Sequence, residues 1–197
     1  MSIYRNISDL ERAIRGILLQ TEPNAGLGGV PRPGIRETPT RVAKALLEWT
    51  SGYSQDVKAI FKVFDDGAEK VDGMVIVKDI PFYSHCEHHM APFFGTVDIG
   101  YIPNANEPKI VGLSKLARLT DIFAHRWQVQ ERMTNQIADA IVDNLAPVGV
   151  GVVTRARHMC MESRGVRKQG HHTIYSALRG AMKDEPQTRA EFLSLAR

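Results

Sequence analysis

The sequence predicts an α+β fold, in which helices pack on one face of an antiparallel sheet. Apolar residues recur at three- and four-residue spacing over residues 7–20 and 128–145, which is typical of amphipathic helices. Short β-rich runs lie between residues 74 and 103 and again between residues 148 and 182. Because a pair of helices separates the two pairs of strands, each strand pair is expected to be antiparallel. The 197 residues, 43% of them hydrophobic, suffice for one main domain.

The N-terminal segment is predicted to be a helix followed by a loop. Apolar residues share one stripe over residues 7–20, and Ser8 or Asp9 is expected to open the helix. The sequence PNAGLGGVPRPGIRE follows, and its three prolines and four glycines do not propagate regular structure. We therefore predict an N-terminal helix and Gly/Pro-rich loop over residues 1–36, and the main domain over residues 37–197.

The main domain is expected to begin with a helix and then two strands. Thr38 is a good N-cap, Pro39 fits the first helical position, and the helix should end near Gly52. The strands are predicted over residues 74–86 and 93–103. In the second strand every other residue is apolar, so one face of it should be buried. The residues of that face are Val97, Ile99 and Tyr101.

Two helices, two strands and a final helix are predicted for the rest of the chain. Ser114 should open a helix that continues through His125, and the helix over residues 128–145 should face inward with its apolar stripe. Strands follow over residues 148–160 and 171–182. The last helix begins near Pro186, and its expected anchors are Phe192 and Leu195.

Composition disfavours several classes of protein. The apolar runs are far shorter than the roughly 20 residues of a membrane-spanning helix, and the N-terminus carries charges without the apolar core of a signal peptide. We therefore expect a cytoplasmic protein with no membrane partner. A net charge of +3 is too small to indicate a nucleic-acid partner. Cys86 and Cys160 are expected to be free or metal-bound thiolates, because disulfides are rare in reducing compartments.

The motif SHCEHH indicates a metal site. The spacing of Cys86 and His89 lets one turn aim a thiolate and an imidazole at one ion, and Cys160 offers a third ligand. A plainer interpretation is that both cysteines are small buried hydrophobes. The consecutive run from His85 to His89 favours the metal site, because a packed core gains little from such a run. Three ligands, where structural zinc sites have four, favour a catalytic zinc with water in the fourth position.

Two further histidines are candidate proton carriers. If HMC lies on a strand, the side-chain period of two places His158 on the same face as Cys160, beside the metal. His88 stands next to the ligand His89. Imidazoles titrate near neutral pH, and zinc can lower the pKa of water from about 15.7 to about 7.

The motif GLSKLAR indicates an anion site. Ser114, Lys115 and Arg118 at a helix N-terminus could converge on a phosphate, although a solvated basic helix face is the alternative. Arg41 and Arg164 add two candidate cations, so an anionic substrate is indicated.

Gln130 and Glu131 begin the long helix and could recognise a base. A carboxylate there can accept hydrogen bonds from two adjacent N–H donors, such as guanine presents. Otherwise Glu131 is a favourable acid in the first turn of a helix. Spacing alone does not separate these interpretations.

Together these motifs resemble GTP cyclohydrolase I of the zinc-dependent type. The matching segments, which run in order over roughly residues 35–197, are ETPTRVA, SHCEHH, GYIPN, GLSKLAR, QVQER, HMCMESRGV and TRAEFLSL. The resemblance implies the tunnelling fold, in which subunits join their antiparallel sheets into a barrel, and a homodecamer with active sites at subunit interfaces. It also implies hydrolysis of GTP to 7,8-dihydroneopterin triphosphate and formate, the first step towards tetrahydrofolate, other pterins or deazaguanine nucleosides.

The resemblance implies a role for each matching residue. Cys86, His89 and Cys160 match the zinc ligands, and His88 and His158 match the acid and base histidines. Ser114 would assist a later rearrangement. The implied triphosphate contacts are Ser114, Lys115, Arg118, Arg41 and Arg164, and the implied guanine contacts are Gln130 and Glu131.

Two segments depart from the family's pattern. His85 stands where a threonine or methionine is expected, immediately before the first cysteine ligand. The segment QGHHTIYSALRGAM replaces a threonine-rich strand. Its His171 and His172 are further potential metal donors.

Three other functions predict different sequence features. A non-catalytic purine- or pterin-binding relative with structural zinc would be expected to lack His88, His158 or Glu131, and all three are present. A zinc nucleic-acid module would have a closed four-ligand site and a basic domain. A related tunnelling-fold enzyme acting on a different guanine derivative would be expected to lack Lys115 or Arg118.

Overall fold

The computed structural model describes residues 6–22, 32–61, 63–64, 73–107 and 109–196. The chain divides into two compact units, Met1–Ser51 and Gly52–Arg197. The central part of the predicted Gly/Pro-rich loop, residues 23–31, lies outside the described residues.

The described residues of the first unit form two α-helices, both at the predicted places. Helix α1 spans Ile7–Thr21, and helix α2 spans Thr38–Trp49 after a short 3-10 turn, η1, at Pro33–Ile35. The predicted caps were wrong in both helices. Asn6 caps α1, because its Oδ1 accepts a hydrogen bond from the Ser8 backbone N–H at 3.0 Å. Thr38 lies inside α2, where Glu37 is the N-cap residue and makes no side-chain capping bond.

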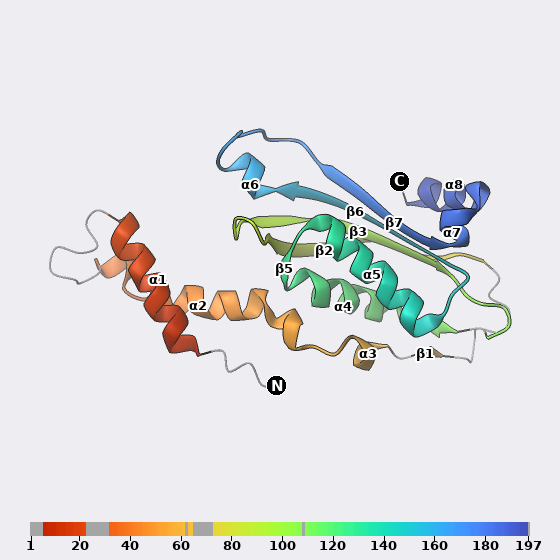
Figure 1. Ribbon diagram of the computed structural model, residues 1–197, viewed down its shortest axis with the longest axis horizontal. Coiled ribbons are helices and arrows are strands. Elements are labelled where there is room, and N and C mark those ends of the chain that lie inside the picture. Colours follow the sequence, from red (N-terminus) through yellow and green to blue (C-terminus); the bar gives the residue numbers. More distant parts are fainter. Residues whose placement is uncertain (1–5, 23–31, 62, 65–72, 108, 197) are drawn as a thin grey trace. The chain divides into compact units, whose positions relative to one another are not determined.

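The second unit is built on a five-stranded sheet in the order β5-β2-β3-β6-β7 (Figure 1). Four long strands pair antiparallel, as predicted, and the short β5 pairs parallel with β2. Two more short strands form a separate ladder, β1 with β4. The bounds are β1 Val63–Phe64, β2 Val75–Cys86, β3 Pro92–Ile102, β4 Ile110–Val111, β5 Trp127–Gln128, β6 Gly149–His158 and β7 Thr173–Gly180.

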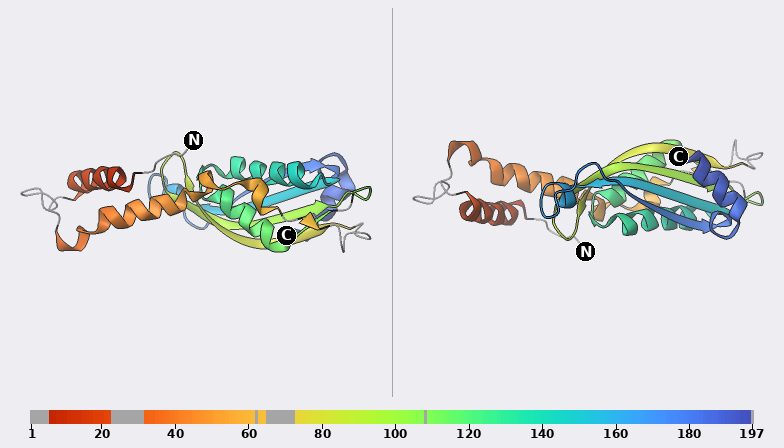
Figure 2. Two further views of the ribbon diagram at one scale, coloured as in Figure 1. Left: turned by 90° about the horizontal axis from the view of Figure 1, so that it is seen from below. Right: turned by 90° about the horizontal axis from the view of Figure 1, so that it is seen from above.

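Helices α4 (Leu113–Ala124) and α5 (Gln130–Leu145) cover one face of the sheet, and α5 lies lengthwise along that face (Figure 2). The predicted face of β3 is buried there, since Val97 and Ile99 are both fully covered. The remaining short elements are η2 Ser51–Ser54, α3 Val57–Ile60, α6 Met159–Glu162 and α7 Ala181–Asp184. The α+β class is therefore confirmed.

The last helix, α8 (Pro186–Leu195), packs on the opposite face at one end of the sheet. Phe192 is fully buried against Gly100 and Gly151, which are paired across β3 and β6. These glycines alternate with the core residues of the other face, which places α8 on the side away from α5. Phe192 is thus an anchor as predicted, whereas Leu195 is 48% exposed and is not.

Among the described residues, no helix is both long enough and apolar enough to cross a membrane.

Candidate metal centre

The first two candidate ligands lie on the turn between β2 and β3. Strand β2 ends at Cys86, whose N–H donates to the carbonyl of Ala91 at 2.9 Å. Met90 has a left-handed φ of 54° and donates to the carbonyl of Cys86 at 2.8 Å, which closes the turn. The turn carries His89 back towards the strand end, so its Nδ1 lies 3.6 Å from Cys86 Sγ.

The third candidate ligand comes from the end of β6. That strand ends at His158, and Cys160 lies in the helical turn α6. The prediction that Cys160 continues the strand was therefore wrong, because the chain turns after His158. Pairing of Phe93 with His158 sets the end of β6 beside the β2–β3 turn. As a result, the ligand atoms of Cys86, His89 and Cys160 all lie within 4.8 Å of one another.

This donor set fits zinc. Two thiolates and one imidazole are typical zinc ligands, and a tetrahedral ion at standard bond lengths would separate a sulfur from a nitrogen ligand by about 3.6 Å. The Sγ–Nδ1 separation of Cys86 and His89 is 3.6 Å. In the described part of the chain, no other group of three or more such donors is this close. Three protein ligands leave a coordination position for water.

The ligands are protonated differently without and with a metal. Burial raises the pKa of the Cys160 thiol, the neighbouring Cys86 adds to the rise, and the positive charge of Arg164 opposes it. Partial desolvation lowers the pKa of His89, and Arg164 and His88 add to that effect. Binding of a metal therefore releases thiol protons, so metal affinity should increase with pH.

His158 is held beside this group in a fixed orientation. Its ring stacks on Phe93 at a centroid distance of 4.9 Å, and its Nε2 lies 2.8 Å from Gln130 Oε1. The amide nitrogen of Gln130 donates to the carbonyls of Thr154 and Thr173, which fixes the amide with its oxygen towards His158. Nε2 of His158 must therefore donate its proton to that oxygen, which leaves Nδ1 as the basic nitrogen.

Burial also controls the charge of His158. It lowers the pKa of the imidazole; the carboxylate of Glu131 opposes the shift, and His171 adds to it. Burial thus favours the neutral form of His158.

The predicted base-recognition pair separates in the structure. Gln130 is 1% exposed and its side chain is turned inward to His158 and the sheet. Glu131, the next residue in the first turn of α5, is exposed. Only the carboxylate of Glu131 is thus available to an incoming ligand.

His88 lies at the rim of the site. Its Nδ1 is 3.9 Å from Cys86 Sγ, and 63% of its side-chain surface is exposed. Its Nε2 is 3.8 Å from the carboxylate of Glu87. That carboxylate is bound by both terminal nitrogens of Arg132, an ion pair that the sequence interpretation missed. The available signal was an acid inside SHCEHH and an arginine directly after Gln130 and Glu131.

The predicted anion-binding residues are not gathered at this group within one chain. Ser84, two residues before Cys86, donates to the carbonyl of Ala124 at the last turn of α4. Ser114 lies ten residues earlier on the same helix, which is roughly 15 Å along its axis. Lys115 and Arg118 share this first half of α4.

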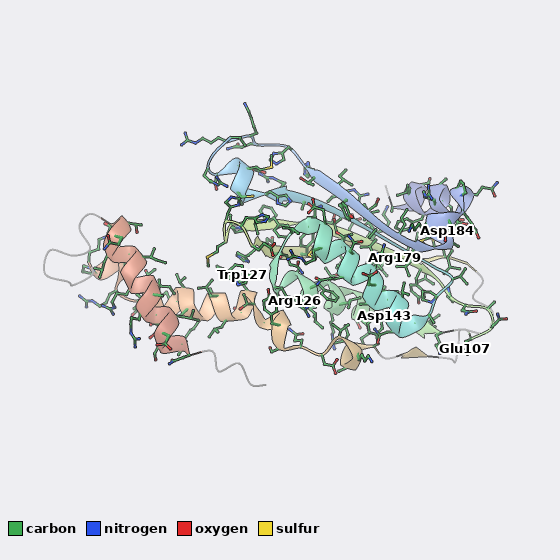
Figure 3. The ribbon with its side chains drawn as sticks, in the orientation of Figure 1. Glu107, Arg126, Trp127, Asp143, Arg179 and Asp184 are labelled. Carbon is green, nitrogen blue, oxygen red and sulfur yellow. The ribbon has the colours of Figure 1, made fainter. Side chains whose placement is uncertain are left out.

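Figure 3 shows the two ends of the second unit. Arg126 and Trp127 are labelled at the end that carries the metal group, where α4 passes into β5 and α5. Glu107 and Asp143 are labelled at the other end, where α4 begins and α5 ends. Ser114 and Lys115, in the first turn of α4, therefore belong to the end remote from Cys86, and Arg118 lies in the middle of the helix.

The two other predicted cations have separate positions. Arg164 follows α6, and its charge acts on both His89 and Cys160, so it borders the metal group. Arg41 belongs to the first unit, where it pairs with Glu37 at 2.6 Å.

The three additional histidines also differ in their surroundings. His85 is buried, meets the ring of Trp127 edge-on at 6.1 Å, and alternates with Cys86 along β2, so it points away from the ligand side. Both ring nitrogens of His171 are buried and have no hydrogen-bond partner among the described residues. His172 is exposed.

Comparison with known proteins gives consistent matches. A family model described as GTP cyclohydrolase I matches residues 11–197. A GTP cyclohydrolase 1 of Janthinobacterium sp. (strain Marseille) is 60% identical over 166 residues, covering 84% of this chain and 82% of that protein. Similar proteins of the same name are 50% identical in Nitrosospira multiformis, over 96% of this chain and 93% of that protein, and in Thermobifida fusca, over 94% and 86%.

Proposed function

Because this chain belongs to the GTP cyclohydrolase I family, we propose that it hydrolyses GTP to 7,8-dihydroneopterin triphosphate and formate, the first step of tetrahydrofolate biosynthesis. The observation that carries the proposal is the convergence of Cys86, His89 and Cys160 beside an oriented His158. This combination provides a zinc site with an open position and a proton-transfer group at its edge.

The residues of the chain divide the work of the reaction. Zinc, when bound, lowers the pKa of a coordinated water so that hydroxide is available near neutral pH. His158, whose Nε2–H donates to Gln130, can accept a proton at Nδ1 and pass it to nitrogen 7 of the purine as the imidazole ring of the base opens. His88, exposed at the rim, would assist opening of the ribose, and Ser114 the later rearrangement.

Substrate contacts are assigned by charge and exposure. The exposed carboxylate of Glu131 would accept from the ring N–H and the exocyclic amine of guanine. The side chain of Gln130 would orient His158, and its backbone, next to Glu131, would lie near the bound guanine. The triphosphate would be bound by Arg164 at the metal group and by Arg41, Ser114, Lys115 and Arg118.

The test is an assay of the zinc-loaded protein with GTP, in which formate release and the ultraviolet absorbance of the pterin are both followed. Cys160→Ala should lose zinc and all turnover, whereas His158→Ala should keep zinc and lose most of its ring-opening activity. His172→Ala, which removes an exposed histidine with no assigned role, serves as the control. Absence of turnover by the wild-type protein at one zinc per chain would refute the proposed activity and favour a non-catalytic binder.

We further propose that the chain forms a homo-oligomer, a decamer, and that each complete site lies between subunits. Support comes from α4, whose length places Ser114 roughly 15 Å, and Arg118 roughly 9 Å, before its last residue, Ala124, which contacts β2 beside the metal end of the same chain. A neighbouring subunit would have to present its own α4 N-terminus to the metal group. Exposed apolar side chains on the sheet, such as Tyr83 (67% exposed) and Ile174 (62% exposed), fit a further subunit contact.

Subunit mixing tests this arrangement. Cys160→Ala lacks a metal ligand and Lys115→Ala lacks a cation, so each should be inactive alone. If each site takes its metal from one subunit and its Lys115 from another, equal mixing with exchange of subunits restores about one quarter of the sites. No recovery after verified exchange would show that each chain supplies both groups itself.

All of these site residues lie within residues 37–197, and we propose this range as the catalytic domain, with residues 1–36 as the N-terminal helix and loop. We also propose a cytoplasmic location. Free thiols at Cys86 and Cys160 support it, because zinc-binding thiolates persist in reducing compartments.

A further inference from the structure

Glu87 stands between the metal ligands Cys86 and His89 in the sequence, and its side chain is bound by Arg132 of α5. Its carboxylate accepts hydrogen bonds from both Nη atoms of Arg132, in a two-point pair whose Nη2–Oε1 distance is 2.9 Å. Such a fork has a defined direction as well as a charge. The carboxylate of Glu87 is therefore hydrogen-bonded to α5, and it also lies 3.8 Å from Nε2 of His88 at the rim of the site.

The backbone of Glu87 is attached to the same segment. Its N–H donates to the carbonyl of Gln128 at 2.9 Å, where β5 runs parallel to the end of β2. Arg132 lies only four residues after Gln128, in the first turn of α5. Two independent contacts thus join the metal-binding turn to the β5–α5 junction.

The other side of this junction is attached to the strands that carry His158 and lead to Cys160. Gln130, in the same turn of α5 as Arg132, bonds to His158 and to the carbonyls of Thr154 and Thr173. The first turn of α5 therefore lies between the two halves of the metal site. Arg132 holds one half, and Gln130 holds the other.

We propose that Glu87 and Arg132 are a positioning pair, which fixes Cys86 and His89 relative to His158, Cys160 and the guanine-binding Glu131. The proposal rests on the proposed function only for its effect on turnover; its effect on the metal follows from the site alone. The pair is partly exposed, with 46% of the Arg132 and 29% of the Glu87 side-chain surface accessible. Such pairs add little to overall stability, so its effect should appear in the site.

The experiment compares Glu87→Gln and Arg132→Lys with the exchanged pair, Glu87→Arg combined with Arg132→Glu. Arg132→Lys retains the charge but loses the two-point geometry. Glu107→Gln is the matched control, because it removes a carboxylate from an exposed ion pair with Lys109. The zinc dissociation constant is measured on the full chain by competition with a chromophoric chelator, and kcat and KM for GTP are measured at saturating zinc.

Each single variant should bind zinc about tenfold more weakly and show about tenfold lower kcat, with little change in KM. The exchanged pair should recover most of the zinc affinity, and the control should match the wild type. Single variants within about twofold of the wild type in both zinc affinity and kcat would overturn the proposal. An exchanged pair no better than the weaker single variant would also overturn it. If the wild-type chain did not turn over GTP, the proposed function would fail while the zinc measurements still decided the role of the pair.

Discussion

Replacing Gln130 with methionine should uncouple His158 from the fold without emptying the space that the glutamine fills. The two side chains are similar in volume, so the cavity term is small. The variant removes four polar contacts of the Gln130 side chain. Of the groups that lose a contact, the Thr154 hydroxyl keeps a hydrogen bond with the Thr134 hydroxyl at 2.9 Å. The carbonyls of Thr154 and Thr173 and the Nε2–H of His158 lose Gln130 as a partner.

The cost follows from the groups left without a partner. A buried donor or acceptor without a partner costs about 1–3 kcal/mol, so the free energy of unfolding should fall by about 3 kcal/mol. Catalysis should suffer more than stability indicates, because a freely rotating His158 no longer presents Nδ1 to the substrate. Since a positioned acid or base contributes about 10²–10⁴-fold, a fall of about 10²-fold in kcat is expected.

Urea unfolding and formate release measure the two effects separately. Gln187→Met, on the exposed side of α8, is the matched control and should change neither quantity. In a His158→Ala background, Gln130→Met should lower kcat no further, because both changes remove the same function. An additive loss in the double variant, or a single variant with wild-type kcat, would refute the orienting role of Gln130.

Three further predictions concern stability. Burial raises the pKa of Tyr101, so its contribution to stability is complete below about pH 10 and is lost as pH rises through the higher folded-state pKa. In urea unfolding, Tyr101→Phe should therefore lose less of its free energy of unfolding at alkaline pH than the wild type does. At pH 7 the same change should cost about 1 kcal/mol, because the Val111 N–H loses its acceptor. Gly151→Ala places a Cβ 2.4 Å from the Phe192 ring and should cost about 1–3 kcal/mol, with partial recovery on combination with Phe192→Leu; equal unfolding midpoints for Gly151→Ala and the wild type would contradict this packing. Removal of zinc by a chelator should lower the free energy of unfolding by about 4 kcal/mol when free zinc had been a thousand times its dissociation constant, and a melting temperature insensitive to the chelator would contradict a specific metal site.

Periodic and local features of this chain could be predicted from its sequence. Helices α1, α2, α4 and α5 and the four long strands follow from repeated apolar spacing, which depends only on neighbouring residues. The ligand group could also be predicted, because Cys86 and His89 belong to one turn and Cys160 was the only other thiol in the chain.

Features that depend on distant contacts could not be predicted in this way. Strand β5 has two residues and exists only because β2 lies beside it, and no periodicity appears over two residues. Cys160 was assigned to a strand because β-rich residues precede it, whereas the chain turns at Met159. Asn6, in place of the predicted Ser8 or Asp9, caps α1; all three residue types are good caps and differ little in energy. The Glu87–Arg132 pair likewise needs the folded sheet to bring its members together.

The distance along the chain between the ligands has a consequence for the order of assembly. Cys86 and Cys160 meet only after β3 has paired with both β2 and β6, so a zinc ion that joins them closes a loop running from residue 86 to residue 160. Bringing such remote segments together is slow, because the entropy of closing the loop is lost before the contact is gained. The sheet must therefore form first, and the ion arrives as a late cross-link that locks an existing fold. Zinc limitation should then yield folded but empty chains that can be loaded afterwards.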